Sequence, residues 1–375
     1  MRVVRIVAGV LLLTQAAQAD ESLRHCMGQT ADRLHFNGVA YTAHRNDVTE
    51  ETFGSSDENG NVPVQLSTRF NIGSAGKMFT AVAIGQLIDR GALRLDAPIG
   101  TYLKELPPAL AGITIRQLLA HTSGLGDYLK PENRELIEKA RTATALLPLA
   151  IGEPPSSAPG SRFAYSNSGY VVLGAIIERI SKRSYAEYLR QEIFAPAAMK
   201  DTTLEDAGSA DPMTRMSPAG PLTKPALSPL RLAFASPAGG EISTAADMAR
   251  FLDALQNDRL ITAATKAALF TEQRTRDGKT GYGLGFTVSP GPPLKVGHGG
   301  GAPGINADVA LFPDSGWKVV TLSNYDPPTA SHMAAVLERT LFAGDRAAAC
   351  ESALNDLALD PAFPTHAPRQ ERPQP

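Results

Sequence analysis

Extended and helical patterns of apolar residues follow one another in a definite order along the chain. Short apolar runs bounded by polar and turn residues predict strands over residues 36–72 and again over residues 282–324. Apolar residues at helical spacing predict helices over residues 115–120, 132–146, 169–180, 185–194 and 329–342. This order predicts an α+β fold, in which an antiparallel β-sheet built from both ends of the chain is flanked by helices and a mostly helical domain is inserted.

The same patterns suggest domain boundaries. We expect a sheet domain of residues 20–92 and 235–350, a helical domain of residues 93–234, and a disordered tail over residues 351–375. Two segments rich in Pro, Gly and Ser, residues 152–160 and 206–240, are too long for simple connections. They either shape the access of a substrate to a pocket or are ordinary disordered insertions, and the sequence leaves both open.

A Ser-x-x-Lys motif, Ser74 to Lys77, stands where an extended stretch gives way to a helix. Residues 64–72 are extended, and apolar residues at helical spacing follow the motif until Gly91. Ser74 is therefore expected near a helix N-terminus, with Lys77 one turn further on and within reach of its hydroxyl. A second copy at residues 315–318 lies between two apolar runs and is interpreted as a hairpin turn.

Tyr165 and Asn167 supply further polar side chains just before a strongly apolar predicted helix. A phenol beside a lysine ammonium ionises more readily, so Tyr165 is a candidate base for the Ser74 proton. The Asn167 amide can orient Lys77 and hydrogen-bond a substrate carbonyl. A capped surface loop is the alternative interpretation of this motif.

Three glycines follow His298 after a short predicted strand. Glycine lets another backbone or a substrate approach closely, and the N–H groups of such a strand can hold a developing oxyanion. A glycine-rich turn between strands is the alternative interpretation. Taken together, the three motifs supply a nucleophile, two groups able to move its proton and an oxyanion site.

In this order and with these separations, the motifs resemble those of the serine β-lactamase and penicillin-binding-protein superfamily. The resemblance runs from about residue 36 to residue 342 and includes stretches at residues 118–125, 239–247, 282–285 and 298–304. By motif the chain is similar to the class C β-lactamase-like branch, which also holds DD-peptidases, D-amino-acid peptidases and family VIII carboxylesterases. The resemblance implies a β-lactamase/transpeptidase-like fold, and the motifs are expected to meet between the two domains.

The resemblance also implies roles for the motif residues. The candidates are the catalytic residues Ser74, Lys77 and Tyr165 and the substrate-binding residues Asn167, His298, Gly300 and Gly301. Ser74 would form an acyl-enzyme, and the backbone N–H groups of Ser74 and Gly301 would hold the oxyanion. Whether Lys77 or Tyr165 is the base stays open, because coupled groups titrate together.

One departure from the penicillin-recognising pattern bears on the substrate. Lys-Thr-Gly or Lys-Ser-Gly is usual at this strand in the superfamily, and its ammonium and hydroxyl bind the substrate carboxylate. Here His298 and Gly299 stand instead, so a permanent charge becomes titratable and a hydroxyl is lost. Each lost charged hydrogen bond is worth about 1.5 to 3 kcal/mol, which disfavours efficient β-lactam hydrolysis. Arg231, or another cation in the loop before Gly239, could compensate. DD-peptidase activity stays open, because a histidine is known at this place among DD-peptidases of the superfamily.

The first residues have the layout of a secretory signal peptide: a basic start, an apolar run over residues 6–13 and a small-x-small signal that ends at Ala19. The run is shorter than the about 20 residues that span a bilayer, so no stable membrane insertion is expected. We expect cleavage near Ala19, with residues 1–19 as leader, and a periplasmic or secreted protein.

An isolated cysteine pair in an exported protein is expected to be bonded, so Cys26 and Cys350 are a candidate disulfide. The resembling fold brings the terminal helices together on one face of the sheet, which makes this pairing reasonable. Two buried, inert thiols are the alternative.

The composition is that of a globular enzyme, with 43% hydrophobic and 20% charged residues and a formal net charge of −2. Nothing in this balance indicates nucleic acid as a partner, and the His and Cys spacings suggest neither a metal nor another cofactor. We expect an exported serine hydrolase that cleaves a small ester, a D-amino-acid peptide or a cell-wall stem peptide. The alternatives are a penicillin-binding sensor or binding module with little turnover, and a weak β-lactamase. The sequence leaves the oligomeric state open.

Overall fold

An antiparallel sheet of eight strands forms the centre of the structure, a computed structural model in which residues 20–57, 60–205, 235–275 and 281–357 are described. Its strand order is β2-β1-β10-β9-β8-β7-β6-β5. The first strand pairs with the last, so both ends of the chain build one sheet, which confirms the predicted α+β fold. The strands are β1 (Gly38–His44), β2 (Asp47–Phe53), β5 (Arg274–Thr275), β6 (Gly281–Tyr282), β7 (Thr287–Ser289), β8 (Lys295–Ala302), β9 (Ile305–Phe312) and β10 (Trp317–Ser323).

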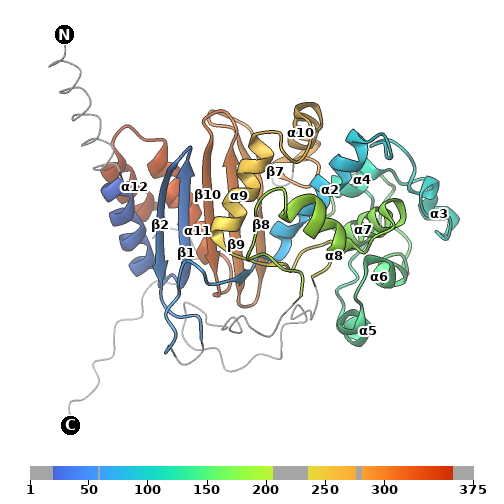
Figure 1. The fold of residues 1–375 in the computed structure, drawn as a ribbon, viewed down its shortest axis with the longest axis horizontal. Coiled ribbons are helices and arrows are strands. Elements are labelled where there is room, and N and C mark those ends of the chain that lie inside the picture. Colours follow the sequence, from blue (N-terminus) through green and yellow to red (C-terminus); the bar gives the residue numbers. More distant parts are fainter. Residues whose placement is uncertain (1–19, 58–59, 206–234, 276–280, 358–375) are drawn as a thin grey trace.

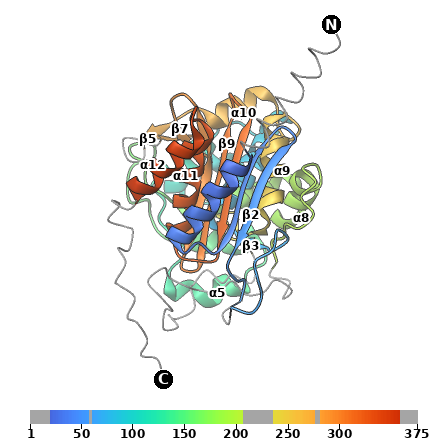
Figure 2. The ribbon, with the colours of Figure 1, turned by 90° about the vertical axis from the view of Figure 1, so that its left-hand side faces the viewer.

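Different helices cover the two faces of this sheet (Figure 1). Side chains alternate along the strands, so Ala310 of β9 belongs to one apolar layer and Val309 to the other. The helices of the first layer, which Figure 2 shows along the sheet, are residues 20–34, α11 (Thr329–Leu341) and α12 (Arg346–Leu357). Those of the second layer include α2 (Lys77–Asp89), α9 (Ala245–Gln256) and α10 (Ala263–Phe270).

The helical part of the chain extends from the end of the sheet that lies away from both termini (Figure 1). Its helices are α3 (Pro108–Ala111), α4 (Ile115–Leu119), α5 (Arg134–Lys139), α6 (Ala143–Ala150), α7 (Asn167–Ser181) and α8 (Tyr185–Leu189), the last continued by a π-helical turn, Arg190–Phe194. The single helix predicted over residues 132–146 is wrong. It is two helices, because Ala140 is extended and Thr142 caps α6 by accepting a hydrogen bond from the Ala145 N–H at 3.1 Å.

The helix α2 is buried at every position from Lys77 to Leu87. Apart from Lys77, Thr80 and Gln86 its buried side chains are apolar, and α7, α8, α10 and β8 pack around it. The 3₁₀ turn η1 (Gly73–Gly76) precedes it, and Gly91 follows its end in a left-handed conformation at φ +69°. The helix therefore carries Lys77 into the region where the sheet meets the helical part.

The two cysteines form a disulfide that ties the first described helix to the last. The Cα atoms of Cys26 and Cys350 are 5.9 Å apart. The expected start of the disordered tail at residue 351 is wrong, because α12 continues to Leu357 and buries Leu354 and Leu357 in the first apolar layer. Residues 358–375 and the predicted leader, residues 1–19, lie outside the described residues. None of the helices in the described ranges has the length and apolar character needed to cross a membrane.

Candidate active site

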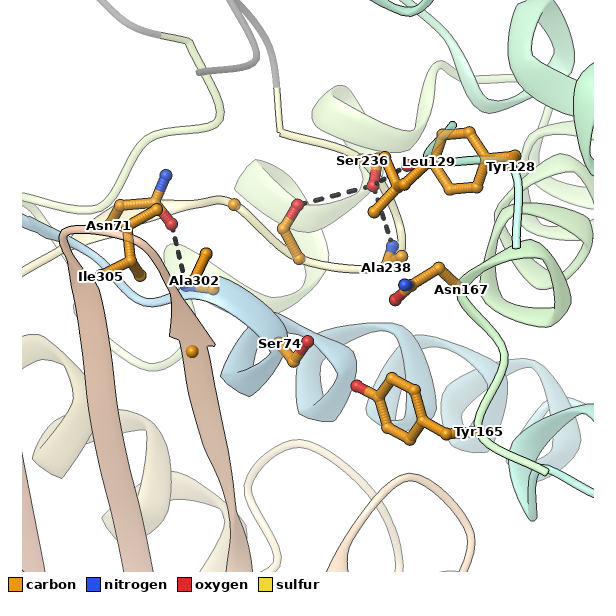
Figure 3. A pocket seen from close by; sticks show the side chains of 14 residues that line it. Asn71, Ser74, Tyr128, Leu129, Tyr165, Asn167, Ser236, Ala238, Ala302 and Ile305 are labelled. Carbon is orange, nitrogen blue, oxygen red and sulfur yellow. Dashed lines mark hydrogen bonds between the residues drawn. The ribbon is translucent and has the colours of Figure 1, made fainter. Parts of the chain in front are cut away.

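Ser74 lies in the turn that joins a short strand to the buried helix α2. The strand β3 (Phe70–Asn71) pairs with β4 (Ile242–Ser243), and η1 begins two residues after it. Gly73 has the left-handed φ of +51°, and its N–H donates to Oδ1 of Asn71 at 2.8 Å. The chain thereby turns sharply and presents Ser74 to a cavity (Figure 3).

Glycines let two other segments touch this turn. A Cβ atom on Gly300 of β8 would lie 1.9 Å from the carbonyl oxygen of Ile72. A Cβ atom on Gly239 would lie 2.1 Å from the carbonyl oxygen of Gly73. No side chain fits at either position, so the backbones of β8 and of the segment around Gly239 hold Ser74 between them.

Lys77 is fully buried and makes three hydrogen bonds. Its Nζ lies 3.1 Å from Ser74 Oγ, 2.8 Å from Asn167 Oδ1 and 2.6 Å from the carbonyl oxygen of Ala238. The amide and carbonyl oxygens can only accept, so two N–H groups of Lys77 must point at them. The third bond can run either way, because an ammonium donates to Ser74 whereas a neutral amine accepts the Ser74 proton. The surroundings therefore fit Lys77 equally well as a cation and as a base.

A carboxylate holds Asn167 in one orientation. Ser166 caps α7 by accepting a hydrogen bond from the Gly169 N–H at 3.0 Å, which places Asn167 in the first turn. The Nδ2 of Asn167 donates to Oδ2 of Asp127 at 2.7 Å, and this turns Oδ1 toward Lys77. Asp127 belongs to none of the three sequence motifs, and only the tertiary structure brings it to the site.

Tyr165 lies across the cavity with its hydroxyl directed toward Ser74 (Figure 3). It is 38% exposed, so a bound molecule can reach it. Lys77 Nζ is 4.8 Å from the centre of its ring, within the range of a cation–π contact. The ring of the buried His121 lies against the Tyr165 ring, with 4.2 Å between their centres, and supports it.

His298 belongs to a buried chain of hydrogen bonds rather than to the cavity wall. The Ser166 N–H donates to Nδ1 of His121 at 3.1 Å. The Nε2 atoms of His121 and His298 lie 3.1 Å and 2.9 Å from the Tyr282 hydroxyl, and Nδ1 of His298 lies 2.6 Å from the Gly299 carbonyl oxygen. An assignment in which both imidazoles are neutral and Tyr282 donates to His298 satisfies all four bonds. In this arrangement His298 presents no charge to the cavity.

The cavity has a volume of about 170 Å³ and brings together residues from all three motifs. The predicted site residues that line it are Ser74, Tyr165, Asn167 and Gly301. Lys77 and His298 are buried outside this lining, and Gly300 is pressed against the turn. A Cβ atom on Gly73 would lie 3.2 Å from the backbone nitrogen of Gly301, so an amide of β8 lies beside the turn that carries Ser74.

The cavity wall also includes residues that the motifs did not single out. Ser236 and Ala238 belong to the end of the predicted access segment, and Tyr128 donates to Ser236 Oγ at 2.8 Å (Figure 3). Burial raises the pKa of Tyr128, so it acts here as a neutral donor. The rest of that segment, residues 206–234 with Arg231, lies outside the described residues. Nowhere in the described ranges do three His, Cys, Asp or Glu side chains form a cluster that could hold a metal ion.

Known proteins are similar to this chain in sequence. The Beta-lactamase family model matches residues 23–342. Penicillin-binding protein 4* of Bacillus subtilis (strain 168) is 29% identical over 319 residues, which cover 80% of this chain and 70% of the relative. Penicillin-binding protein 4 of Amycolatopsis lactamdurans is 30% identical over 305 residues, which cover 74% of this chain and 78% of the relative.

Solved structures share the fold. A penicillin-binding protein from Bacillus halodurans has a TM-score of 0.76 at 26% identity and covers 84% of this chain and 99% of its own. A D-amino acid amidase from Ochrobactrum anthropi SV3 has a TM-score of 0.73 at 23% identity and covers 90% of this chain and 99% of its own. Since the family model matches most of the sequence, the chain belongs to the Beta-lactamase family, within the serine β-lactamase and penicillin-binding-protein superfamily of serine hydrolases.

Proposed function

We propose that the protein cleaves small esters or amides through an acyl-enzyme on Ser74. The observation that carries this proposal is the set of three hydrogen bonds around Lys77. Two of them fix N–H groups on acceptors, so a neutral Lys77 directs its lone pair at the Ser74 hydroxyl 3.1 Å away. A base within hydrogen-bond reach is the geometric requirement for activating a serine.

The steps follow from this geometry. Lys77 takes the Ser74 proton while Oγ forms a bond to the substrate carbonyl carbon, and the carbonyl electrons move to its oxygen. The N–H groups of Ser74 and Gly301 stabilise that oxyanion. As the bond to the leaving group breaks, Tyr165 gives the leaving group a proton and regains one from Lys77. Water then attacks the acyl-enzyme by the same route, which releases the acid and restores Ser74.

The cavity favours substrates that carry no carboxylate. In the part of the chain that the structure describes, its lining consists of hydroxyl, amide, backbone and apolar groups, and none of its side chains is charged. A substrate carboxylate would therefore lack a charged partner worth about 1.5 to 3 kcal/mol, or one to two powers of ten in affinity. We therefore favour small esters and amino-acid amides over stem peptides with a terminal carboxylate. The neighbour named as a D-amino acid amidase makes amides of D-amino acids the first compounds to test.

Parallel rate measurements test the proposal. We expect p-nitrophenyl acetate and D-phenylalanine amide to be turned over with a kcat/KM about ten- to a hundredfold above that of a D-Ala-D-Ala peptide. Ser74→Ala should abolish turnover, whereas Ser315→Ala, in the second Ser-x-x-Lys copy, should retain it. Stable labelling by a fluorescent penicillin without any turnover would instead support the sensor. Penicillin hydrolysis faster than ester cleavage would support the weak β-lactamase.

Export is part of the proposal and is supported by the leader pattern and by the disulfide, which suits an oxidising compartment. Expression of the full chain, followed by fractionation and N-terminal sequencing, tests it. We expect a mature protein that starts at Asp20 outside the cytoplasm. An uncleaved cytoplasmic chain would contradict export and leave the hydrolase proposal standing.

A further inference from the structure

His121 is a fully buried residue that holds the backbone on both sides of Tyr165. It lies two residues after the end of α4. Its carbonyl oxygen accepts a hydrogen bond from the Ala164 N–H at 2.8 Å, and its Nδ1 accepts one from the Ser166 N–H at 3.1 Å. Ala164 and Ser166 are the chain neighbours of Tyr165, so one residue fixes the segment that carries this phenol.

The backbone of His121 is held in an uncommon conformation. Its φ is +54°, in the left-handed region that residues with a side chain rarely adopt. Such a conformation persists where the surrounding structure imposes it, and it is found most often at functional sites. The ring packs among three tyrosines, with 4.2 Å, 5.0 Å and 4.7 Å between its centre and those of Tyr165, Tyr170 and Tyr282. These contacts and the two hydrogen bonds hold His121 in place.

The same residue reaches Asn167 through Ser166. The Ser166 Oγ donates to the carbonyl oxygen of Gly126 at 2.8 Å, while the Ser166 N–H donates to His121. Ser166 is thus fixed by its side chain and by its backbone, and α7 starts from it. Tyr165 and Asn167 flank Ser166, so both depend on His121 for their place in the site.

Tyr282 anchors the His121 ring to the sheet. Nδ1 of His121 accepts a hydrogen bond, so the ring has its proton on Nε2, which donates to the Tyr282 hydroxyl at 3.1 Å. That hydroxyl lies 2.9 Å from Nε2 of His298 on β8. The strand β8 also contributes Gly301 to the cavity wall. The Tyr282 hydroxyl therefore links the segment that carries Tyr165 to the strand that carries Gly301.

We propose that His121 is a positioning residue that holds Tyr165 where its hydroxyl gives a proton to the leaving group, and that Tyr282 anchors the His121 ring for this task. His121 does not line the cavity, so it acts through Tyr165. A proton donor works only within hydrogen-bond reach of the atom that it protonates, so a small displacement of Tyr165 lowers the rate. This inference rests on the proposed function, in which Tyr165 protonates the leaving group.

A comparison of two leaving groups tests the inference. The nitrogen of an amide needs a proton to depart, whereas p-nitrophenolate leaves without one. His121→Ala removes the ring and the acceptor for the Ser166 N–H. We expect kcat/KM to fall by about a hundredfold with D-phenylalanine amide and by about tenfold or less with p-nitrophenyl acetate. A variant that merely contains less folded enzyme loses the same factor with both substrates.

His121→Asn should restore part of the amide activity. Asparagine adopts the left-handed conformation more readily than alanine, and its amide oxygen can accept a hydrogen bond from the Ser166 N–H. We expect kcat/KM with the amide to be about tenfold higher than in His121→Ala. Circular dichroism and the melting temperature check that each variant is folded.

Tyr282→Phe is the milder variant, because it keeps the ring and removes the hydroxyl alone. We expect kcat/KM to fall by about three- to tenfold with the amide and by a smaller factor with the ester. The matched control is Tyr188→Phe, which removes the hydroxyl of a buried tyrosine that Arg90 contacts at 3.3 Å, at the end of α2 opposite to Lys77. Both rates should be unchanged in this control.

Nitrogen NMR of the histidines gives a readout that does not depend on turnover. The ring resonances that disappear in His121→Asn should be those of the tautomer with its proton on Nε2, because Nδ1 accepts from Ser166. A proton on Nδ1 of this ring would overturn the inference.

The rate measurements separate the inference from the proposed function. Equal losses with the two substrates in His121→Ala and Tyr282→Phe, or no loss with either, would overturn the inference and leave the proposed function intact. A wild-type chain that turns over neither substrate would overturn the proposed function itself.

Discussion

The amine of Lys77 lies 2.6 Å from the carbonyl oxygen of Ala238, a residue 161 positions further along the chain. That oxygen carries no hydrogen, so it fixes one N–H of Lys77, and Asn167 fixes a second. The third position of the nitrogen faces Ser74. Three separate segments therefore orient one nitrogen, and such preorganisation lowers the cost of reaching a reactive geometry.

Replacement of Lys77 should remove most of the activity while the fold is kept. Lys77→Arg preserves the charge but cannot act as a base, so we expect kcat to fall by about 10²- to 10⁴-fold. Lys130→Ala, which removes a lysine on the surface, should leave kcat unchanged. Steady-state kinetics with circular dichroism as a check on folding measure this. A Lys77→Arg enzyme within tenfold of wild type would exclude Lys77 as the base.

Asp127 should affect the rate only through Asn167. We expect Asn167→Ala to lower kcat/KM by about a hundredfold and Asp127→Ala by about tenfold, because the second variant frees the amide to rotate. The double variant should be no slower than Asn167→Ala alone. A double-variant cycle measures the coupling, and fully additive effects would mean that Asp127 acts independently.

The disulfide between Cys26 and Cys350 should contribute stability but not activity. It closes a loop of 324 residues between the terminal helices, for which the chain-entropy model gives about 6 kcal/mol as an upper value. Cys26→Ser with Cys350→Ser should therefore lower the free energy of unfolding and leave kcat/KM unchanged. Denaturant unfolding with and without reductant measures the difference. An unchanged midpoint on reduction would show that the bond contributes no stability.

Glu241 should make the protein less stable as the pH rises. Its carboxyl group is fully buried, and burial raises its pKa from 4.5 to about 8, so between these values the folded chain binds more of this proton than the unfolded chain. Stability from this group is fully present below about pH 4.5 and is lost as the pH rises through about 8, by about 1.4 kcal/mol per unit of pKa difference. The melting temperature of wild type relative to Glu241→Gln should fall across this window. Parallel melting curves would contradict the buried neutral carboxyl group.

The sequence predicted features that depend on neighbours in the chain. The strand-to-helix turn at Ser74 follows from a change of apolar spacing within a few residues, and the hairpin of β9 and β10 follows from a turn between two apolar runs. The α+β fold followed from the order of such elements. The break at Thr142 escaped prediction, because the apolar spacing continues across it while the cap interrupts the helix.

The remaining site contacts join distant segments through groups that leave little trace in a sequence. The Ala238 contact uses a backbone oxygen, which every residue has, and Asp127 is one of many surface carboxylates. The orientation of the His298 side chain could not be predicted either. Its place in the motif suggested a substrate contact, whereas its ring nitrogens form hydrogen bonds with Tyr282 and Gly299. The orientation of a ring depends on partners that only the folded chain brings together.

Trapping the acyl-enzyme tests the central proposal most directly. The full chain would be mixed with a slow ester or penicillin, quenched in acid, digested with trypsin and analysed by mass spectrometry. Residues 70–77 form a tryptic peptide in which Ser74 is the one serine. We predict the mass of the acyl group on this peptide in wild type and on no peptide in Ser74→Ala. An acyl group on any other peptide, or turnover that survives in Ser74→Ala, would contradict the assignment of Ser74 as the nucleophile.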